Sequence, residues 1–275
     1  MRINNNLMSM NTYRQYSINA TNSATSTEKL SSGYRINRAG DDAAGLAISE
    51  KMRAQIRGLN MASKNSQDAI SLVQTAEGAL NETHSILQRM RELAVQAASD
   101  TNDNTTDRVA LNAEFDALID EIDDIASKTA FNGKVLLSGG FATNGLMIQT
   151  GADATQTLEI EIGDMSAGAT GLNVSGELLT TQTDASDAIT AVNDAINKVS
   201  TARSNMGAIQ NRLQHKINNL DTSSENLSAA ESRIRDLDMA KEMTNYTKNN
   251  ILVQAATAML AQANSAPQGV LQLLQ

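Results

Sequence analysis

The sequence predicts a mainly α protein, a long antiparallel coiled-coil-like helical rod with a small β-hairpin region. Two features of the composition favour rods over a wide globular core. The 275 residues include one proline, the residue that most strongly disrupts a helix interior. Aromatic residues make up 3% of the chain and tryptophan is absent, so the side chains that usually dominate a broad core are scarce.

The third observation is a repeat of apolar residues at alternating steps of three and four positions. This spacing gives a helix one narrow apolar stripe. The first segment contains Leu72, Ala76, Ala79, Thr83, Ile86, Met90, Leu93 and Ala97. The second contains Leu111, Phe115, Leu118, Ile122 and Ile125. The third contains Ile189, Val192, Ile196, Val199, Met206, Leu213, Ile217, Leu220, Leu227 and Ile234. We expect these helices to bury their stripes against one another.

The β region lies between the second and third helical segments. Asn132-Gly133 is a strong turn signal, and residues 135–137, 145–148 and 158–162 have the composition or the alternation of short strands. Residues 163–184 are rich in Gly, Thr, Ser and Asp, which predicts an exposed loop without a core of its own.

The two ends have apolar residues that are too sparse to hide within one chain. Residues 1–40 are rich in Asn, Ser and Thr, and residues 236–275 are only weakly amphipathic. Our hypothesis is that both ends are largely disordered in the free chain and become helical when other copies cover their apolar faces.

Charge and residue inventory argue against several functions. Residues 58–230 hold ten Lys or Arg against 23 Asp or Glu, which does not favour a nucleic-acid surface. No apolar stretch approaches the length that a membrane-spanning helix needs. Cysteine is absent, and His84 and His215 are the only histidines. We therefore expect no enzyme, cofactor or metal site. The acidic cluster at 120–124 is interpreted as a solvated helix face and Gly139-Gly140 as a turn.

Several long runs stand at the two ends of the chain. Near the N-terminal end they are Glu28 to Gly33 (EKLSSG), Arg35 to Asn37 (RIN), Ala39 to Ser49 (AGDDAAGLAIS) and Gln88 to Gln96 (QRMRELAVQ). Near the C-terminal end they are Ala230 to Asp236 (AESRIRD), Met239 to Met243 (MAKEM) and Met259 to Asn264 (MLAQAN). In these runs the sequence closely resembles bacterial flagellins.

The resemblance implies a domain organisation and a function. Residues 1–42 and 235–275 would pair as the N- and C-terminal helices of an inner filament-core domain. Residues 43–234 would form a rod-like helical domain with a β patch at 133–165 and the exposed loop at 163–184, without large outer domains. Each copy would polymerise into the bacterial flagellar filament for swimming motility. The alternatives are a hook-filament junction protein and a secreted coiled-coil adaptor.

The resemblance also implies partners and location. The chain would be exported unfolded by the flagellar type III apparatus, without a cleaved signal peptide, and would be extracellular. The missing signal peptide alone would instead suggest the cytoplasm. Expected partners are other flagellin copies, flagellar cap and junction proteins, an export chaperone at the C-terminus and Toll-like receptor 5 of a host. Nucleic acid and membrane insertion are not expected.

Two groups of site residues follow from the resemblance. The candidates for contact with the innate immune receptor are Gln88, Arg89, Arg91, Leu93, Gln96 and Glu114. The candidates for assembly or chaperone binding are Ile3, Leu7, Met10, Met243, Ile251, Val253, Leu260, Val270, Leu271, Leu273 and Leu274. The receptor candidates have packing between neighbouring subunits as the alternative role.

Overall fold

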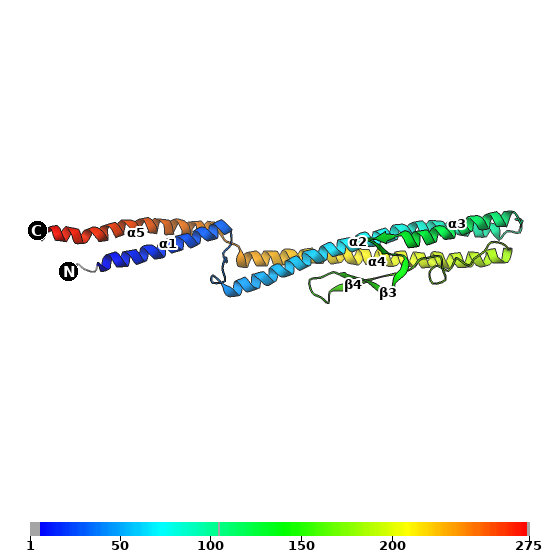
Figure 1. The fold of residues 1–275 in the computed structure, drawn as a ribbon, viewed down its shortest axis with the longest axis horizontal. Helices are drawn as coiled ribbons and strands as arrows, with labels where there is room; N and C mark the ends of the chain where they lie inside the picture. The colour runs from blue at the N-terminus through cyan, green and yellow to red at the C-terminus, as the bar shows by residue number, and fades with distance from the viewer. Residues whose placement is uncertain (1–5, 104, 274–275) are drawn as a thin grey trace. The chain divides into compact units, whose positions relative to one another are not determined.

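The structure is a computed structural model that describes residues 6–103 and 105–273 (Figure 1). Its helices are α1 (Leu7–Ser32), α2 (Ala43–Ala97), α3 (Asp107–Lys128), α4 (Gln182–Arg235) and α5 (Met239–Leu273). Its strands are β1 (Ala130–Phe131), β2 (Lys134–Val135), β3 (Ser138–Gln149) and β4 (Thr157–Asp164). The strands form two antiparallel pairs, β1 with β2 and β3 with β4. The predicted mainly α fold with a small β-hairpin region is confirmed.

The chain divides into two compact units. The terminal unit comprises residues 1–56 and 225–275, and the central unit comprises residues 57–224. Both α2 and α4 contribute residues to each unit. The terminal unit is therefore built from the two ends of the chain, which are far apart in sequence.

In the central unit α2 packs antiparallel to both α3 and α4. Four side-chain contacts fix these directions: Arg89 with Glu114 and Arg108 with Ala97 between α2 and α3, and Gln210 with Glu77 and Ser63 with Asp221 between α2 and α4. Because two helices cover α2, the face that it buries is wider than the seam of a two-helix coiled coil.

Because the buried face is wider than predicted, part of the predicted α2 stripe is wrong. Ala79 and Ile86 are only partly buried, whereas Leu80 and Leu87, which the spacing did not select, are completely buried. The predicted α3 stripe is also incomplete. Its buried residues include Phe115 and Ile122, as predicted, but the spacing missed Ile119.

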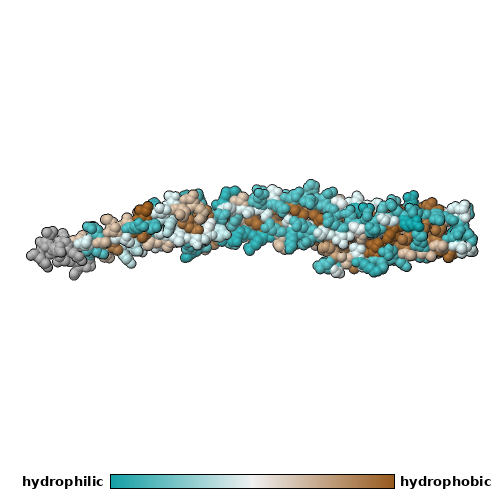
Figure 2. All heavy atoms as spheres, turned by 90° about the horizontal axis from the view of Figure 1, so that it is seen from above, coloured by the Kyte–Doolittle hydropathy of each residue, from teal (hydrophilic) through white to brown (hydrophobic). Residues whose placement is uncertain are grey.

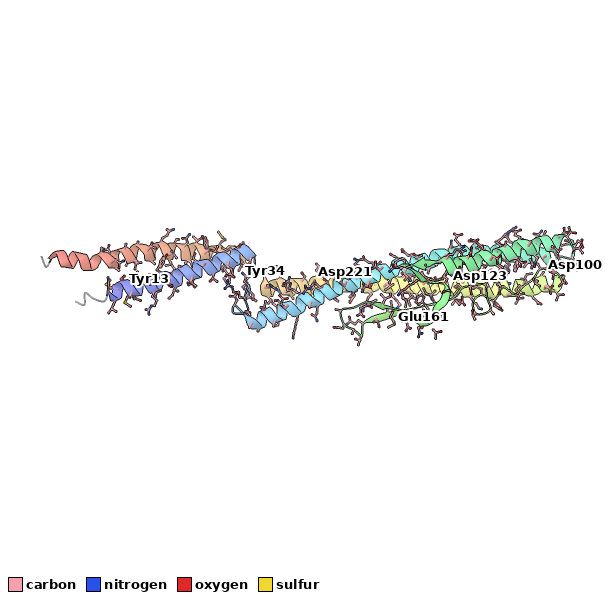
Figure 3. The ribbon with its side chains drawn as sticks, in the orientation of Figure 1. Tyr13, Tyr34, Asp100, Asp123, Glu161 and Asp221 are labelled. Carbon is pink, nitrogen blue, oxygen red and sulfur yellow. The ribbon has the colours of Figure 1, made fainter. Side chains whose placement is uncertain are left out.

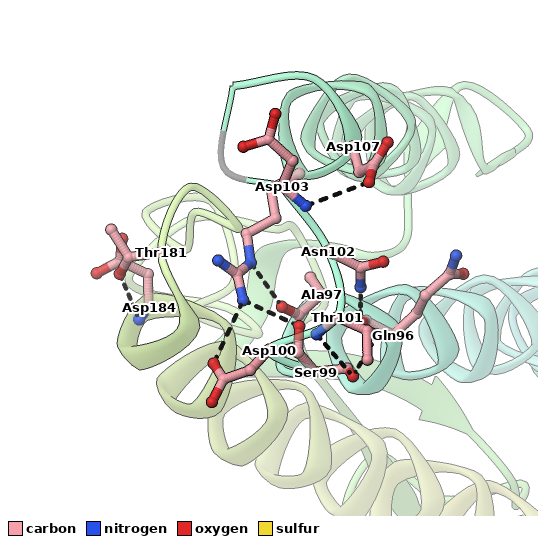
Figure 4. A network of polar contacts seen from close by, with 11 residues as sticks. Gln96, Ala97, Ser99, Asp100, Thr101, Asn102, Asp103, Asp107, Thr181 and Asp184 are labelled. Carbon is pink, nitrogen blue, oxygen red and sulfur yellow. Dashed lines mark hydrogen bonds and ion pairs between the residues drawn. The ribbon is translucent and has the colours of Figure 1, made fainter.

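The turn between α2 and α3 is organised by the buried guanidinium of Arg108, which is 4% exposed (Figure 4). Its Nε donates to the carbonyl oxygen of Ala97 at 2.8 Å, and its Nη2 donates to that of Ser99 at 3.0 Å. The last carbonyls of a helix have no partner within the helix. A cation is also favoured at this end by the helix dipole, so Arg108 satisfies both requirements at the end of α2.

The short β1–β2 hairpin turns at Asn132 and Gly133, both of which have positive φ angles of 49° and 77°. This is the backbone that a two-residue hairpin loop requires, and the predicted turn is confirmed. The predicted strand at 135–137 is wrong beyond Val135. Leu136 and Leu137 form a bend instead, which turns both side chains into the core.

The prediction of an exposed loop at 163–184 is wrong. After β4 the segment contributes Leu172, Val174 and Leu179 to the core of the central unit. It runs antiparallel along α3, where Asp123 Oδ1 accepts from the Ala167 N–H at 2.7 Å and Asn112 Oδ1 accepts from the Leu179 N–H at 2.8 Å. The composition hid this role because widely spaced apolar residues in a Gly- and Ser-rich segment have no helix or strand period.

In the terminal unit α2 begins at Ala43. The Asp42 carboxylate accepts from the Gly45 N–H at 2.9 Å and so caps the first turn of the helix. Asp41 accepts from the N–H groups of Arg38 and Asn37, and these hydrogen bonds lower the pKa of its carboxyl.

The segment between α1 and α2 crosses the break between α4 and α5. Tyr34 belongs to this segment and lies at the crossing (Figure 3). The Arg35 N–H donates to the Arg235 carbonyl oxygen at 2.7 Å, and the Leu237 N–H donates to that of Gly33 at 3.0 Å. The Arg235 guanidinium lies 4.9 Å from the centre of the Tyr34 ring and also binds Glu50. The Arg235 side chain thus links α2 to the point where these segments cross.

The neighbours Leu178 and Leu179 test whether the segment after β4 belongs to the core. Leu179 is 0% exposed and Leu178 is 49% exposed. We expect Leu179→Ala to lower the free energy of unfolding by about 2–4 kcal/mol, because it leaves a cavity. Leu178→Ala should change it by less than about 1 kcal/mol. Urea unfolding of the monomer measures both, and equal effects would contradict the buried path.

The crossing should also respond to pH. The hydrogen bond from Arg235 holds the pKa of the Glu50 carboxyl below its ordinary value of 4.5. Such a group stabilises the folded state above its unfolded pKa, and the contribution is lost as the pH falls through the lowered folded pKa. We therefore expect amide protection at Arg35 and Leu237 to fall on acidification below about pH 4.5. In Glu50→Gln this part of the pH dependence should be absent; an unchanged profile would show that the Arg235 contact does not hold the crossing.

Candidate assembly and receptor surfaces

The helices α1 and α5 pack antiparallel in the terminal unit, with Asn6 close to Ala263 and Ser26 close to Glu242. Each helix turns one stripe of buried or half-buried residues toward the other, at alternating steps of three and four. In α1 the stripe is Ser9, Thr12, Tyr16, Asn19, Ser23, Ser26 and Leu30. In α5 it is Glu242, Tyr246, Asn249, Val253, Ala256, Leu260 and Ala263. We call these two stripes the seam.

The seam is mostly polar or small, and large apolar side chains face outward. The exposed ones on the two helices are Leu7, Met8, Met10, Tyr13, Ile18, Met239, Met243, Ile251, Leu252 and Met259. On the face that Figure 2 shows, brown and tan atoms are visible among white and teal ones. Large exposed apolar side chains that gather into a patch usually mark a surface that binds a partner.

The assembly candidates fall into three groups. Leu7, Met10, Met243 and Ile251 are exposed on the outward surface. Val253 and Leu260 are half-buried in the seam. The remaining candidates lie outside the described residues, either entirely or in their side chains: Ile3, Val270, Leu271, Leu273 and Leu274.

Sequence reasoning missed six of the ten outward residues. The residues that were not proposed as candidates, although all six are exposed, are Met8, Tyr13, Ile18, Met239, Leu252 and Met259. The available signal was indirect. A heptad of Ser, Thr and Asn in α1 marks the face that packs within the chain, so the apolar residues off that heptad had to face outward.

The receptor candidates lie on α2 and α3 of the central unit. All but one of them are exposed on the surface. Gln88, Arg89, Arg91, Gln96 and Glu114 are exposed. Arg89 forms ion pairs with Glu114 at 2.8 Å and with Glu92 at 3.1 Å. The hydrogen bonds that its guanidinium donates to these carboxylates, the one to Glu114 first, raise its pKa.

Leu93 is the exception, and its prediction as a surface contact is wrong. It is 1% exposed because it belongs to the core of the central unit. The exposed apolar side chain of this turn is Val95, at 54%. Val95 and four polar neighbours line an open cavity of about 570 Å³: Gln88, Arg91, Glu92 and Gln96.

The polar groups that suggested other chemistry have structural partners. In the acidic cluster Asp123 accepts from Ala167, and Asp124 pairs with Lys128. Among the described residues no three His, Cys, Asp or Glu side chains are grouped to hold a metal ion. Within the same residues no helix is both long enough and apolar enough to span a bilayer.

Two of the charged residues that line a groove of about 600 Å³ between β4 and α4, Lys198 and Asp164, have partners within the chain. Lys198 Nζ donates to the Gly171 carbonyl oxygen at 3.0 Å. Asp164 accepts from the Ser166 N–H and the Thr170 hydroxyl, and these bonds lower the pKa of its carboxyl although burial opposes them. The groove is therefore held together by its own polar residues.

Known proteins match both ends of the chain. Residues 3–142 match the bacterial flagellin N-terminal helical region, and residues 189–274 match the bacterial flagellin C-terminal helical region. The chain is 55% identical to a flagellin of Bacillus subtilis (strain 168) and 56% identical to a flagellin of Halalkalibacterium halodurans, covering 100% of both chains in each case. The crystal structure of Bacillus cereus flagellin is 38% identical with a TM-score of 0.50, over 61% of this chain and 94% of that one. The chain therefore belongs to the bacterial flagellin family and is a structural subunit of the flagellar filament, an extracellular helical polymer.

Proposed function

We propose that this filament serves swimming motility and that the outward apolar surface of α1 and α5 is where its copies join. In this proposal residues 1–42 and 235–275 form the inner filament core, and residues 43–234 form the rod around it. This proposal is supported chiefly by the observation that most of the described large apolar side chains of these two helices are exposed off their common seam.

The size of the hydrophobic contribution favours this assignment. Among the described residues, ten large apolar side chains are exposed on α1 and α5. Burying half of them against neighbours would contribute on the order of 10 kcal/mol. This is comparable to the cost of fixing one molecule against another, so each copy needs several such neighbours at once. Contacts that repeat head to tail without closing generate a helical polymer.

The same surface has consequences before assembly. We propose that the chain is exported unfolded by the flagellar type III apparatus, without a cleaved signal peptide. An export chaperone would cover the apolar C-terminal segment until then, because an exposed amphipathic helix binds readily in an apolar groove. Cap and junction proteins would meet the same terminal helices at the ends of the filament.

A single charge on this surface tests the proposal. Ile251 is 59% exposed on the outward side of α5. We expect Ile251→Asp to slow elongation from wild-type filament seeds by roughly a hundredfold or more, since assembly would bury an unpaired carboxylate. Ile251→Val keeps an apolar side chain and should elongate at nearly the wild-type rate. Electron microscopy and light scattering of seeded monomer measure both, and normal growth of Ile251→Asp would remove this face from the interface.

We also propose that released monomers are recognised by Toll-like receptor 5 through Gln88, Arg89, Arg91, Gln96 and Glu114. The ion pairs of Arg89 with Glu92 and Glu114 hold its guanidinium in place, and a fixed arginine on the surface is a suitable small binding centre.

Arg89→Ala tests the receptor proposal. We expect it to reduce receptor activation by monomers roughly tenfold or more, since truncating a central arginine contact typically costs at least 1–2 kcal/mol. Arg212→Ala removes an exposed arginine from α4 and serves as the matched control. A reporter-cell dose response compares the two at equal monomer concentration, and unchanged potency of Arg89→Ala would exclude the proposed contact.

A further inference from the structure

Methionine is the side chain through which an oxidant would act on this protein. The chain contains twelve methionines and neither cysteine nor tryptophan, so no thiol or indole competes for the oxidant. Oxidation converts the apolar thioether of methionine into a sulfoxide, which is polar and chiral and disrupts interfaces rich in methionine. The positions of the methionines therefore decide which property of the molecule oxidation changes.

Most of the exposed methionines lie on the outward apolar surface of α1 and α5. Met1 is outside the described residues, and seven of the others are between 48% and 68% exposed. Met61 and Met147 belong to the central unit. The other five, which we call the outward methionines, are Met8, Met10, Met239, Met243 and Met259. They make up half of the ten large apolar side chains exposed on these two helices.

The outward methionines are spread over both ends of the region where α1 and α5 pair. Met239 and Met243 are one helical turn apart at the beginning of α5. Met8 and Met10 lie at the beginning of α1, and the contacts of that end with α5 place them at the level of Met259. An interface formed over either end of this surface would therefore contain methionine.

We propose that the outward methionines are an oxidation site at which hydrogen peroxide prevents a free copy from joining the filament. The thioether sulfur attacks one peroxide oxygen, the S–O bond forms as the O–O bond breaks, and the second oxygen leaves as water after it takes a proton. Sulfur is oxidised and the peroxide is reduced. Assembly would then bury an unpaired S–O dipole in place of a thioether, at a cost in free energy.

The inference rests on the proposed joining surface and adds a chemical control over which copies can join. The central unit keeps its own core methionines out of reach, because Met90, Met165 and Met206 are at most 8% exposed. Oxidation of a folded copy would therefore spare that core and change the joining surface. Copies already in a filament would be protected, since their neighbours would cover the outward methionines.

Peroxide treatment of the full-length monomer tests the proposal. Peptide mass spectrometry should find the outward methionines converted to sulfoxides well before Met90, Met165 and Met206. Once the outward methionines are converted, we expect elongation from untreated wild-type seeds to slow by roughly tenfold or more, because several sulfoxides would enter each interface. Elongation at the wild-type rate by fully converted monomer would overturn the inference.

Leucine replacement separates the outward methionines from the exposed ones elsewhere. Leucine is apolar, has nearly the volume of methionine and contains no sulfur. We expect peroxide-treated monomer to keep its untreated elongation rate when leucine replaces Met8, Met10, Met239, Met243 and Met259. The matched control, Met61→Leu with Met147→Leu, should slow on treatment as the wild type does. A fivefold variant that stays as sensitive as the wild type, or a control that becomes resistant, would contradict the proposal.

A pair of glutamine variants needs no oxidant and guards against a fivefold variant that does not assemble. Met243→Gln places a polar side chain of similar length on the outward surface, and Met147→Gln does the same in the central unit. We expect the first to slow seeded elongation severalfold and the second to leave it unchanged. Equal rates would overturn the inference and leave the proposed function intact. Normal growth of Ile251→Asp would instead overturn the joining surface itself.

Discussion

The organisation of the terminal unit depends on where α1 and α5 place their apolar side chains. The seam between them is built largely from Ser, Thr, Asn and Ala, whereas Leu7, Ile18 and Ile251 face outward. A single copy therefore leaves most of its large apolar residues in this unit in contact with water. The constraint accounts for the low apolar content of the seam and for the need for neighbours that the family membership implies.

The central unit follows the opposite rule. Its core extends from α2 to α3 and α4, and from there to the β3–β4 hairpin and the segment after β4. Its polar groups stabilise turns and crossings, as Arg108 does at the end of α2. This unit can stabilise itself within one chain, because its apolar residues meet one another inside it.

The sequence predicted the long helices, the turn at Asn132-Gly133 and the pairing of the two ends, because each depends on a local period or on a long family motif. It failed where burial depends on a second neighbour. Leu80 and Leu87 became core residues only because two helices cover α2. Leu93 is buried, as its place in the predicted α2 stripe implies, although the family resemblance made it a receptor candidate. Leu172 and Leu179 were missed because a segment without regular structure can still lie along α3. Fewer than half of the outward residues were predicted, since the polar heptad that determines their direction was interpreted only as low helix stability.

The positions of the ring side chains have a practical consequence for spectroscopy. All four tyrosines, at positions 13, 16, 34 and 246, belong to the terminal unit, and all three phenylalanines, at 115, 131 and 141, belong to the central unit. Tryptophan is absent from the chain. Phenol absorption and phenol fluorescence of the unlabelled protein therefore report on the terminal unit alone. Far-ultraviolet circular dichroism averages over every helix, so the two optical signals together separate events at the chain ends from events in the rest of the molecule.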